Sequence, residues 1–131
     1  MTDKLTITKD EGRVVVFHLA GKLDGQTHQA LLDAAQGEYE GGTRFLLIDL
    51  HEIEMISSAG LGTLHNIYKL FTPKDEIDAW EKEKQGEPYK SDYFKLAAAS
   101  ANVYYVLNIA GFLSNIPIHS DLSGALESFP K

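Results

Sequence analysis

The sequence of 131 residues contains no cysteine, no long apolar run and fewer basic than acidic residues. The absence of cysteine excludes disulfides and thiolate chemistry. No stretch reaches the roughly 18 consecutive apolar residues that a membrane-spanning helix needs. The first ten residues also lack the apolar core of a signal peptide. We therefore expect a cytoplasmic protein without membrane insertion.

The charge balance argues against two classes of partner. The chain has 12 lysine and arginine residues against 19 aspartate and glutamate residues, which gives a formal net charge of −7. General binding of nucleic acid or anionic lipid needs clustered positive charge, so neither partner is expected. The apolar fraction of 44% is ordinary for a globular core. The length fits a single domain over residues 1–131.

The signatures of common enzymes and metal sites are also missing. No histidine stands at a metal-ligand spacing from a second histidine, and neither a phosphate-binding P-loop nor a Gly-x-Ser-x-Gly elbow is present. A serine nucleophile at Ser58 would need a base, which a spatial neighbour such as His51 could supply. We expect no enzyme, no metal and no cofactor. His18 and His119 fall in predicted strands and are interpreted as structural.

Hydrophobic spacing alternates between strand and helix patterns along most of the chain. Two β-rich segments around a Glu-Gly turn predict an antiparallel hairpin, followed by a polar loop over 21–26. The predicted order is β-β-α-β-α-β-α-β-α, an α/β fold with a mixed, mostly parallel sheet of about five strands and about four helices packed on it. The predicted strands are 5–7, 14–19, 45–48, 93–99 and 116–119, and the predicted helices are 27–40, 61–71, 103–110 and 122–129.

The segment 72–92 does not fit this rhythm. It is longer than most connections in compact domains and is rich in both charge signs. Thr72 followed by Pro73 resembles a helix cap with proline at the first helical position, so an extra helix near 73–85 is predicted. Ile77 and Trp80 would share one face of it. This charged insertion is interpreted either as a solvated helix pinned by Trp80 or as a partner or self-association surface.

The stretch from Phe45 to Leu61 is the most informative part of the chain. It reads as an apolar strand, a short acidic connection, and two serines with a glycine where a helix begins. A serine at a helix start lies beside free backbone N–H groups, which suits either simple capping or a bound phosphate. The following helix should bury one apolar stripe and expose its other side. The predicted buried residues are Leu61, Leu64, Ile67, Tyr68 and Phe71, and the predicted exposed residues are Gly62, Thr63, His65, Asn66 and Lys69.

Four segments resemble the STAS domain family, in particular the bacterial anti-sigma factor antagonists. Gly21–Asp24 resembles the family's Gly-Glu-Leu-Asp, and Leu47–Leu50 resembles its apolar strand ending in Asp-Leu. Ile56–Gly62 resembles its Asp-Ser-Ser/Ala-Gly-Leu signature, with Ser57 in place of the frequent aspartate. Val106–Phe112 resembles its late helix with a closing Gly-hydrophobic pair. The resemblance covers most of the chain outside the charged insertion.

The resemblance implies partner switching in transcription regulation. Ser58 aligns with the serine that a serine kinase, itself an anti-sigma factor, phosphorylates, and a PP2C-type phosphatase would reverse the modification. Unphosphorylated protein would bind the kinase, and phosphorylated Ser58 would release it. The charged insertion is expected beside this partner surface. The implied partner-binding residues are Asp24, Ser57, Ala59, Gly62, Thr63, His65 and Asn66.

Two questions stay open on the residues alone. Asp24 and Asp49 are expected at the same end of the sheet, either as turn and cap residues or as charges that order the loop and repel a phosphate. The alternative function is a STAS binding module without phosphorylation in a lipid-transport or signalling complex.

Overall fold

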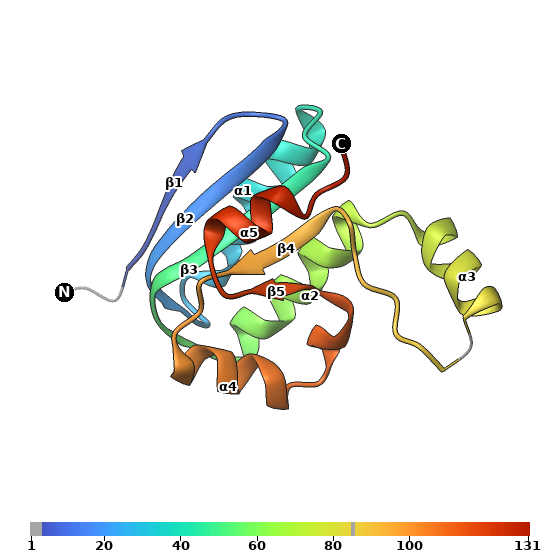
Figure 1. The fold of residues 1–131 in the computed structure, drawn as a ribbon. Helices are drawn as coiled ribbons and strands as arrows, with labels where there is room; N and C mark the ends of the chain where they lie inside the picture. The colour runs from blue at the N-terminus through green and yellow to red at the C-terminus, as the bar shows by residue number, and fades with distance from the viewer. Residues whose placement is uncertain (1–3, 85) are drawn as a thin grey trace.

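A five-stranded mixed sheet forms the centre of the computed structural model, which describes residues 4–84 and 86–131 (Figure 1). The strands lie in chain order, β1-β2-β3-β4-β5. β1 pairs with β2 antiparallel, and every later pair is parallel. The predicted hairpin and the predicted mixed sheet are therefore confirmed. The strands are β1 (Leu5–Asp10), β2 (Val14–Leu23), β3 (Phe45–Ile56), β4 (Phe94–Ala97) and β5 (Ile118–His119).

Helices cover the two faces of the sheet unequally. The main core lies on one face and combines side chains of three helices with alternate side chains of the strands. A smaller core on the other face joins Val16, Leu47 and Ala97 to Ala125 and Phe129 at the C-terminus. The helices of the main core are α1 (His28–Glu40), α2 (Ser58–Phe71) and α4 (Ala101–Ile109), and the opposite face carries α5 (Leu122–Glu127).

Burial on both faces explains the continuous apolar runs of the central strands. Val15 and Phe17 point into the main core, whereas Val16 between them points into the smaller one. Leu46 and Leu47 divide in the same way in β3. Successive strand residues alternate between faces, so strand segments that are covered on both sides read as continuous apolar runs.

The acidic connection predicted after residue 48 is wrong, because β3 continues to Ile56. β2 likewise extends over the first three residues of the predicted loop 21–26 and ends at Leu23, which lies opposite Ile56 in the parallel register. Glu52 and Glu54 are exposed while Ile53 between them is buried. The acidic side chains lie on the solvent-exposed face of this part of the strand. The prediction ended the strand too early because it required a continuous run of apolar residues.

The extra helix predicted near 73–85 is confirmed as α3 (Lys74–Glu83), and Gln85 lies outside the described residues. Its predicted cap is wrong. Pro73 occupies the N-cap position, while Thr72 is buried and its hydroxyl lies 2.9 Å from that of Ser91. α3 projects from the body of the molecule (Figure 1). No helix among the described residues has both the length and the apolar character needed to cross a bilayer.

Three late elements are shorter than predicted. β4 spans only four residues and β5 only two. The last helix ends at Glu127, before the predicted Phe129, and Asp121 caps it by accepting a 2.7 Å hydrogen bond from the Gly124 N–H. Phe129 still packs in the smaller core from the chain that follows the helix. The apolar spacing therefore predicted the burial of Ala125 and Phe129 correctly, but Leu126 of the same apolar set is exposed and the predicted helix end is wrong.

Candidate functional site

The first turn of α2 is held in place by the end of β2. Ser57 is the N-cap residue, and its hydroxyl accepts a 3.3 Å hydrogen bond from the Gly60 N–H. Its own N–H donates a 2.9 Å hydrogen bond to the Leu23 carbonyl. Of the two serines at the helix start, Ser57 is therefore the one that caps the helix. The helix start is fixed both by its cap and by a bond to the neighbouring strand.

Gly60 allows this close approach. A Cβ at this position would lie 2.6 Å from the Leu23 carbonyl oxygen and 2.8 Å from the Leu23 Cγ. It would also lie 3.0 Å from the Ile56 Cγ2. Real Cβ atoms do not approach a backbone oxygen this closely, so any larger residue would push α2 away from the sheet.

Ser58 is the first helical residue, and its side chain is exposed. Its hydroxyl makes no hydrogen bond to any residue within 4–84 and 86–131, and the helix cap is supplied by Ser57. The N-terminus of a helix carries partial positive charge and unpaired N–H groups. An anionic group on this hydroxyl would therefore be accommodated without unfolding the helix.

Asp24 lies in the turn between β2 and α1, and its carboxylate is turned back onto that turn. Its Oδ1 accepts hydrogen bonds from the N–H groups of Gln26, at 2.9 Å, and Thr27, at 3.2 Å. The Thr27 hydroxyl donates to the Lys22 carbonyl at 2.7 Å. These contacts form a self-contained polar turn that leads into α1. The turn reading of Asp24 is the one that the contacts favour.

The exposed side of α2 is narrower than the sequence predicts. Ser58, Gly62 and Asn66 are exposed and follow one another at intervals of four, which places them on one stripe of the helix. Thr63 was predicted to be exposed, but it is 2% exposed and its Oγ1 lies 2.9 Å from the Nδ1 of His28 in α1. A threonine at a helix–helix contact can be buried because its hydroxyl finds a partner there. Ala59 and Ser57 are half-buried.

His65 is half-buried on α2, and its ring stacks on Tyr68 with centroids 5.9 Å apart. Burial lowers the pKa of His65, and the nearby Lys69 charge lowers it further. Both effects favour the neutral imidazole. This residue would present an uncharged ring edge to a partner.

Asp49 does not lie at this end of the sheet, which corrects the prediction. It pairs with His18 in the middle of β3, seven residues and roughly 20 Å before Ile56. Its Oδ2 lies 2.7 Å from the His18 Nδ1, and the His18 Nε2 lies 2.8 Å from Asp10. The structural role predicted for His18 agrees with these two contacts.

His51 was considered as a base that could activate Ser58 as a nucleophile, but it lies too far away. His51 lies in β3, five residues and roughly 15 Å along the strand before Ile56. His51, the histidine considered as a base for Ser58, is therefore too far along the strand to contact its hydroxyl. The described part of the chain also contains no group of three histidine, aspartate or glutamate side chains that could hold a metal ion.

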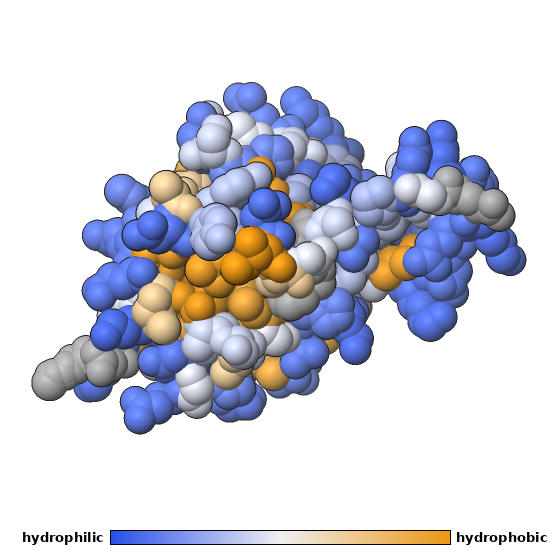
Figure 2. Space-filling model, turned by 90° about the horizontal axis from the view of Figure 1, so that it is seen from below, coloured by the Kyte–Doolittle hydropathy of each residue, from blue (hydrophilic) through white to orange (hydrophobic). Residues whose placement is uncertain are grey.

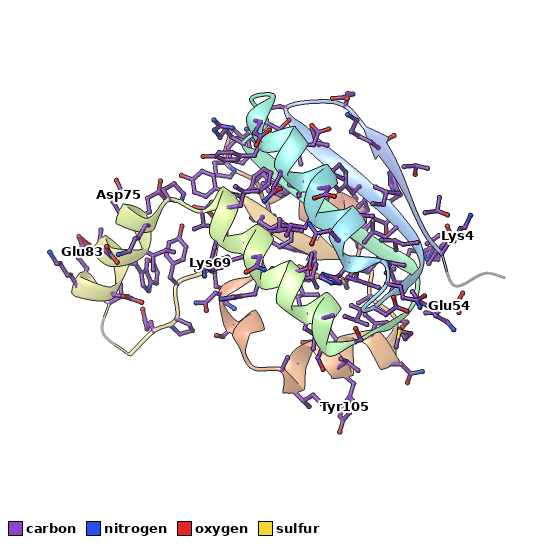
Figure 3. All side chains as sticks on the ribbon, turned by 180° about the vertical axis from the view of Figure 1, so that it is seen from behind. Lys4, Glu54, Lys69, Asp75, Glu83 and Tyr105 are labelled. Carbon is purple, nitrogen blue, oxygen red and sulfur yellow. The ribbon has the colours of Figure 1, made fainter. Side chains whose placement is uncertain are left out.

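The charged insertion lies at the far end of α2, not beside Ser58 as predicted. α2 has 14 residues, which separates its two ends by roughly 20 Å. Figure 3 shows Asp75 and Glu83 on the projecting α3, beyond the Lys69 end of α2. Any partner of the insertion therefore contacts a different region of the molecule.

An apolar surface was missed by the sequence reasoning. Figure 2 views the end of the molecule where α4 and the start of α2 lie, and apolar side chains gather on this face. On α4, Ile109 and Tyr105 are each 64% exposed and Tyr104 is 49% exposed, and Met55, before α2, is 39% exposed. The signal was present in the sequence, because Tyr105 and Ile109 each stand two residues beyond a buried position, Val103 and Leu107, and so point away from the buried side of the helix. Patches of this kind often mark contacts with other proteins.

The sequence model of the STAS domain family matches residues 6–75. This chain belongs to the STAS domain family. The match ends within the first turn of α3, so most of the charged insertion lies outside it. No curated protein sequence matches the chain.

Solved structures support the same STAS fold. An anti-sigma factor antagonist from Mycobacterium paratuberculosis has a TM-score of 0.74 at 24% identity, with 98% of this chain and 96% of that chain covered. A Thermotoga maritima protein assigned as an anti-sigma factor antagonist has a TM-score of 0.74 at 19% identity, with 95% of each chain covered. Phosphorylated SpoIIAA from Bacillus has a TM-score of 0.60 at 14% identity, with 94% of this chain and 96% of that chain covered. These similarities confirm the predicted architecture of this STAS domain.

Proposed function

We propose that this STAS domain is an anti-sigma factor antagonist whose partner is a serine kinase that is also an anti-sigma factor. The unphosphorylated protein binds the kinase, phosphorylation of Ser58 releases it, and a PP2C-type phosphatase restores the binding form. All of this would take place in the cytoplasm within one domain of residues 1–131. The exposed Ser58 hydroxyl at the start of α2 is the observation that carries the proposal.

The different positions of the two serines, with Ser57 as the helix cap and Ser58 exposed, support modification at Ser58. Ser57 holds the cap, so the Ser58 hydroxyl can gain a phosphate without the loss of an internal hydrogen bond. The helix dipole favours the added negative charge in that place. A relative with the same fold, SpoIIAA, has been described in phosphorylated and unphosphorylated forms.

Release follows from the position of the phosphate. Phosphorylation adds about −1.5 to −2 charges and considerable bulk at neutral pH. Gly62 and Asn66 continue the exposed stripe from Ser58, so a partner seated along α2 would cover the modified hydroxyl. Binding of the partner would then remove the negatively charged phosphate from water. The free energy that this desolvation requires weakens the complex but does not destabilise the free protein.

The test is phosphorylation and binding with a cloned serine kinase of the anti-sigma factor class. Ser58→Ala is expected to abolish incorporation of phosphate, measured by intact mass, while kinase binding is retained. Ser58→Glu is expected to weaken binding by about tenfold or more, measured by calorimetry. Ser123 is an exposed serine in the first turn of α5, so Ser123→Glu is the matched control and should bind like the unmodified protein.

Two outcomes would overturn the proposal. A phosphate mapped to a residue other than Ser58 would refute the site. Kinase binding that is equal for Ser58→Glu and the unmodified protein would instead favour a STAS binding module that works without phosphorylation.

A further inference from the structure

A groove of about 700 Å³ lies between α3 and the segment that returns from it to β4. It belongs to the charged insertion, most of which is outside the STAS match. Its floor and walls combine aromatic and acidic side chains. The lining residues are Glu76, Ala79, Trp80, Glu83, Glu87, Pro88, Tyr89, Lys90 and Asp92.

The aromatic walls are fixed by contacts within the described chain. The Trp80 and Tyr89 rings meet edge to face, with centroids 6.0 Å apart. The Trp80 Nε1 donates a 2.9 Å hydrogen bond to the Glu87 carbonyl, and the Asn115 side-chain amide donates a 2.7 Å hydrogen bond to the Tyr89 carbonyl. These contacts fix the two walls relative to each other, and the Asn115 bond fixes the Tyr89 wall to the body of the protein.

The rim of the groove is strongly acidic. Four carboxylate side chains line it against one lysine, Lys90, whose Nζ is drawn away by a 2.8 Å hydrogen bond to the Ser114 carbonyl. The Lys84 Nζ lies 5.9 Å from the Trp80 ring centroid, so a cation already approaches one aromatic wall. An aromatic surface surrounded by carboxylates is complementary to a cationic group with an apolar stem.

One polar atom of the groove lacks a partner. Tyr89 is only 8% exposed, and its hydroxyl makes no hydrogen bond to any residue in the described part of the chain. A buried hydroxyl without a partner is costly, and protein interiors rarely leave one. Because the hydroxyl oxygen is buried, a hydrogen-bonding group in the groove would pair with it only after the Tyr89 ring turned toward the groove.

We propose that this groove binds a basic, extended peptide segment of a protein partner, with a lysine or arginine side chain between the acidic rim and the Trp80 and Tyr89 rings. Alternating basic and leucine side chains match its acidic and aromatic surfaces. The site is separated from Ser58 by the length of α2, roughly 20 Å. It therefore goes beyond the proposed switch and can be occupied whether or not Ser58 is modified.

Trp80 is the only tryptophan in the sequence, so its fluorescence reports directly on the groove. Titration with a decapeptide of alternating arginine and leucine is expected to shift the Trp80 emission, with weaker binding as salt increases. A decapeptide of alternating glutamate and leucine should leave the emission unchanged. The double substitution Glu83→Gln and Glu87→Gln is expected to weaken binding of the basic peptide about threefold to tenfold.

A matched control separates a local site from general attraction to an acidic protein. Glu52 and Glu54 are exposed on β3, and Figure 3 shows Glu54 on the opposite side of the molecule from Glu83. The double substitution Glu52→Gln and Glu54→Gln removes the same charge and should leave peptide affinity within twofold of the unmodified protein.

Three results would overturn the proposal. The first is an unchanged Trp80 emission with the basic peptide at low salt. The second is equal weakening by the two double substitutions. The third is emission that depends on protein concentration alone, which would assign the groove to a second copy of the chain. None of these results bears on phosphorylation of Ser58, so the two proposals fail independently.

Discussion

His18 lies between two carboxylates on the sheet face opposite the main core. Its Nε2 contacts Asp10 at 2.8 Å and its Nδ1 contacts Asp49 at 2.7 Å, so the ring joins the side chains of three adjacent strands. The hydrogen bond to Asp10 raises the pKa of His18, the bond to Asp49 raises it further, and partial burial opposes both. The folded protein therefore favours the charged imidazole.

This raised pKa predicts a pH-dependent contribution to stability. The contribution is fully present below the unfolded pKa of about 6.5 and is lost as the pH rises through the higher folded value. The stability difference between the unmodified protein and His18→Gln should therefore be larger at pH 5.5 than at pH 9, measured by urea unfolding. His51→Gln removes an exposed histidine from the neighbouring strand β3 and is the control for the loss of an imidazole. A larger difference at pH 9 would contradict the assignment.

Single residues were predictable where one local rule decides their role. Capping chemistry predicts a serine cap at the start of α2, and the family resemblance, which assigns Ser58 to phosphorylation, leaves Ser57 for that role. The prediction that Thr63 is exposed was wrong. Helical spacing places Thr63 off the apolar stripe, and only the position of His28 on another helix explains its burial. The contact between Asp49 and His18 could not be predicted from the sequence either, because it depends on the register of β2 and β3.

At the scale of the element, α2 has two glycines with opposite surroundings. Gly60 faces the Leu23 backbone and side chain, whereas a Cβ at Gly62 would meet nothing within 4 Å. The same substitution should therefore have opposite effects at the two positions, because helix propensity favours alanine in both and only one has room for it.

Gly60→Ala is expected to destabilise the protein by about 1–3 kcal/mol, since α2 must move away from the sheet. Gly62→Ala is expected to stabilise it by about 0.5–1 kcal/mol, as for a glycine replaced by alanine in an open helix. Urea unfolding of both variants measures the two effects. Equal effects at the two positions would show that α2 does not pack on the Leu23 backbone in this way.

Element types were predictable from the sequence, but several boundaries were not. The helical stripe of α2 and the apolar core of β3 follow directly from spacing. The last eight residues of β3 did not, because their outward side chains include charged residues that are also typical of loops. Their partner β2, and not their own composition, keeps them in the sheet.

At the scale of the whole molecule, the charged insertion is an appendage. α3 has no buried residue, and Ile77 and Trp80 are its half-buried apolar side chains. The Thr72 and Ser91 hydroxyls, 2.9 Å apart, join the two ends of the insertion at the body of the protein. A short linker could therefore replace the helix without opening the core.

Replacement of residues 74–87 by a three-residue glycine-serine linker is expected to lower stability by only about 1–3 kcal/mol, mainly through the loss of Ile77 and Trp80 contacts. Unfolding in urea should remain cooperative, and amide exchange in β2 and β3 should stay slow. The same variant should lose binding of the basic peptide and retain binding of the kinase. Loss of cooperative unfolding would mean that the insertion is part of the core.

The overall architecture was predictable because the alternation of strands and helices leaves few topologies open. The place of the insertion was not, since its distance from Ser58 depends on the direction and length of α2 across the sheet. The groove between Trp80 and Tyr89 arises from two segments that fold back on each other, and no local pattern predicts such an approach.

The strands of the sheet follow one another in space as they do in the chain. When a strand emerges from the ribosome, the earlier strand with which it pairs has therefore already been synthesised. No strand depends on a later segment for its first pairing. A nascent chain that has reached Phe71 carries β1, β2, β3 and the two helices α1 and α2. Because domains fold largely from the N-terminus during synthesis, the surface around Ser58 can take shape before the charged insertion and the last two strands exist.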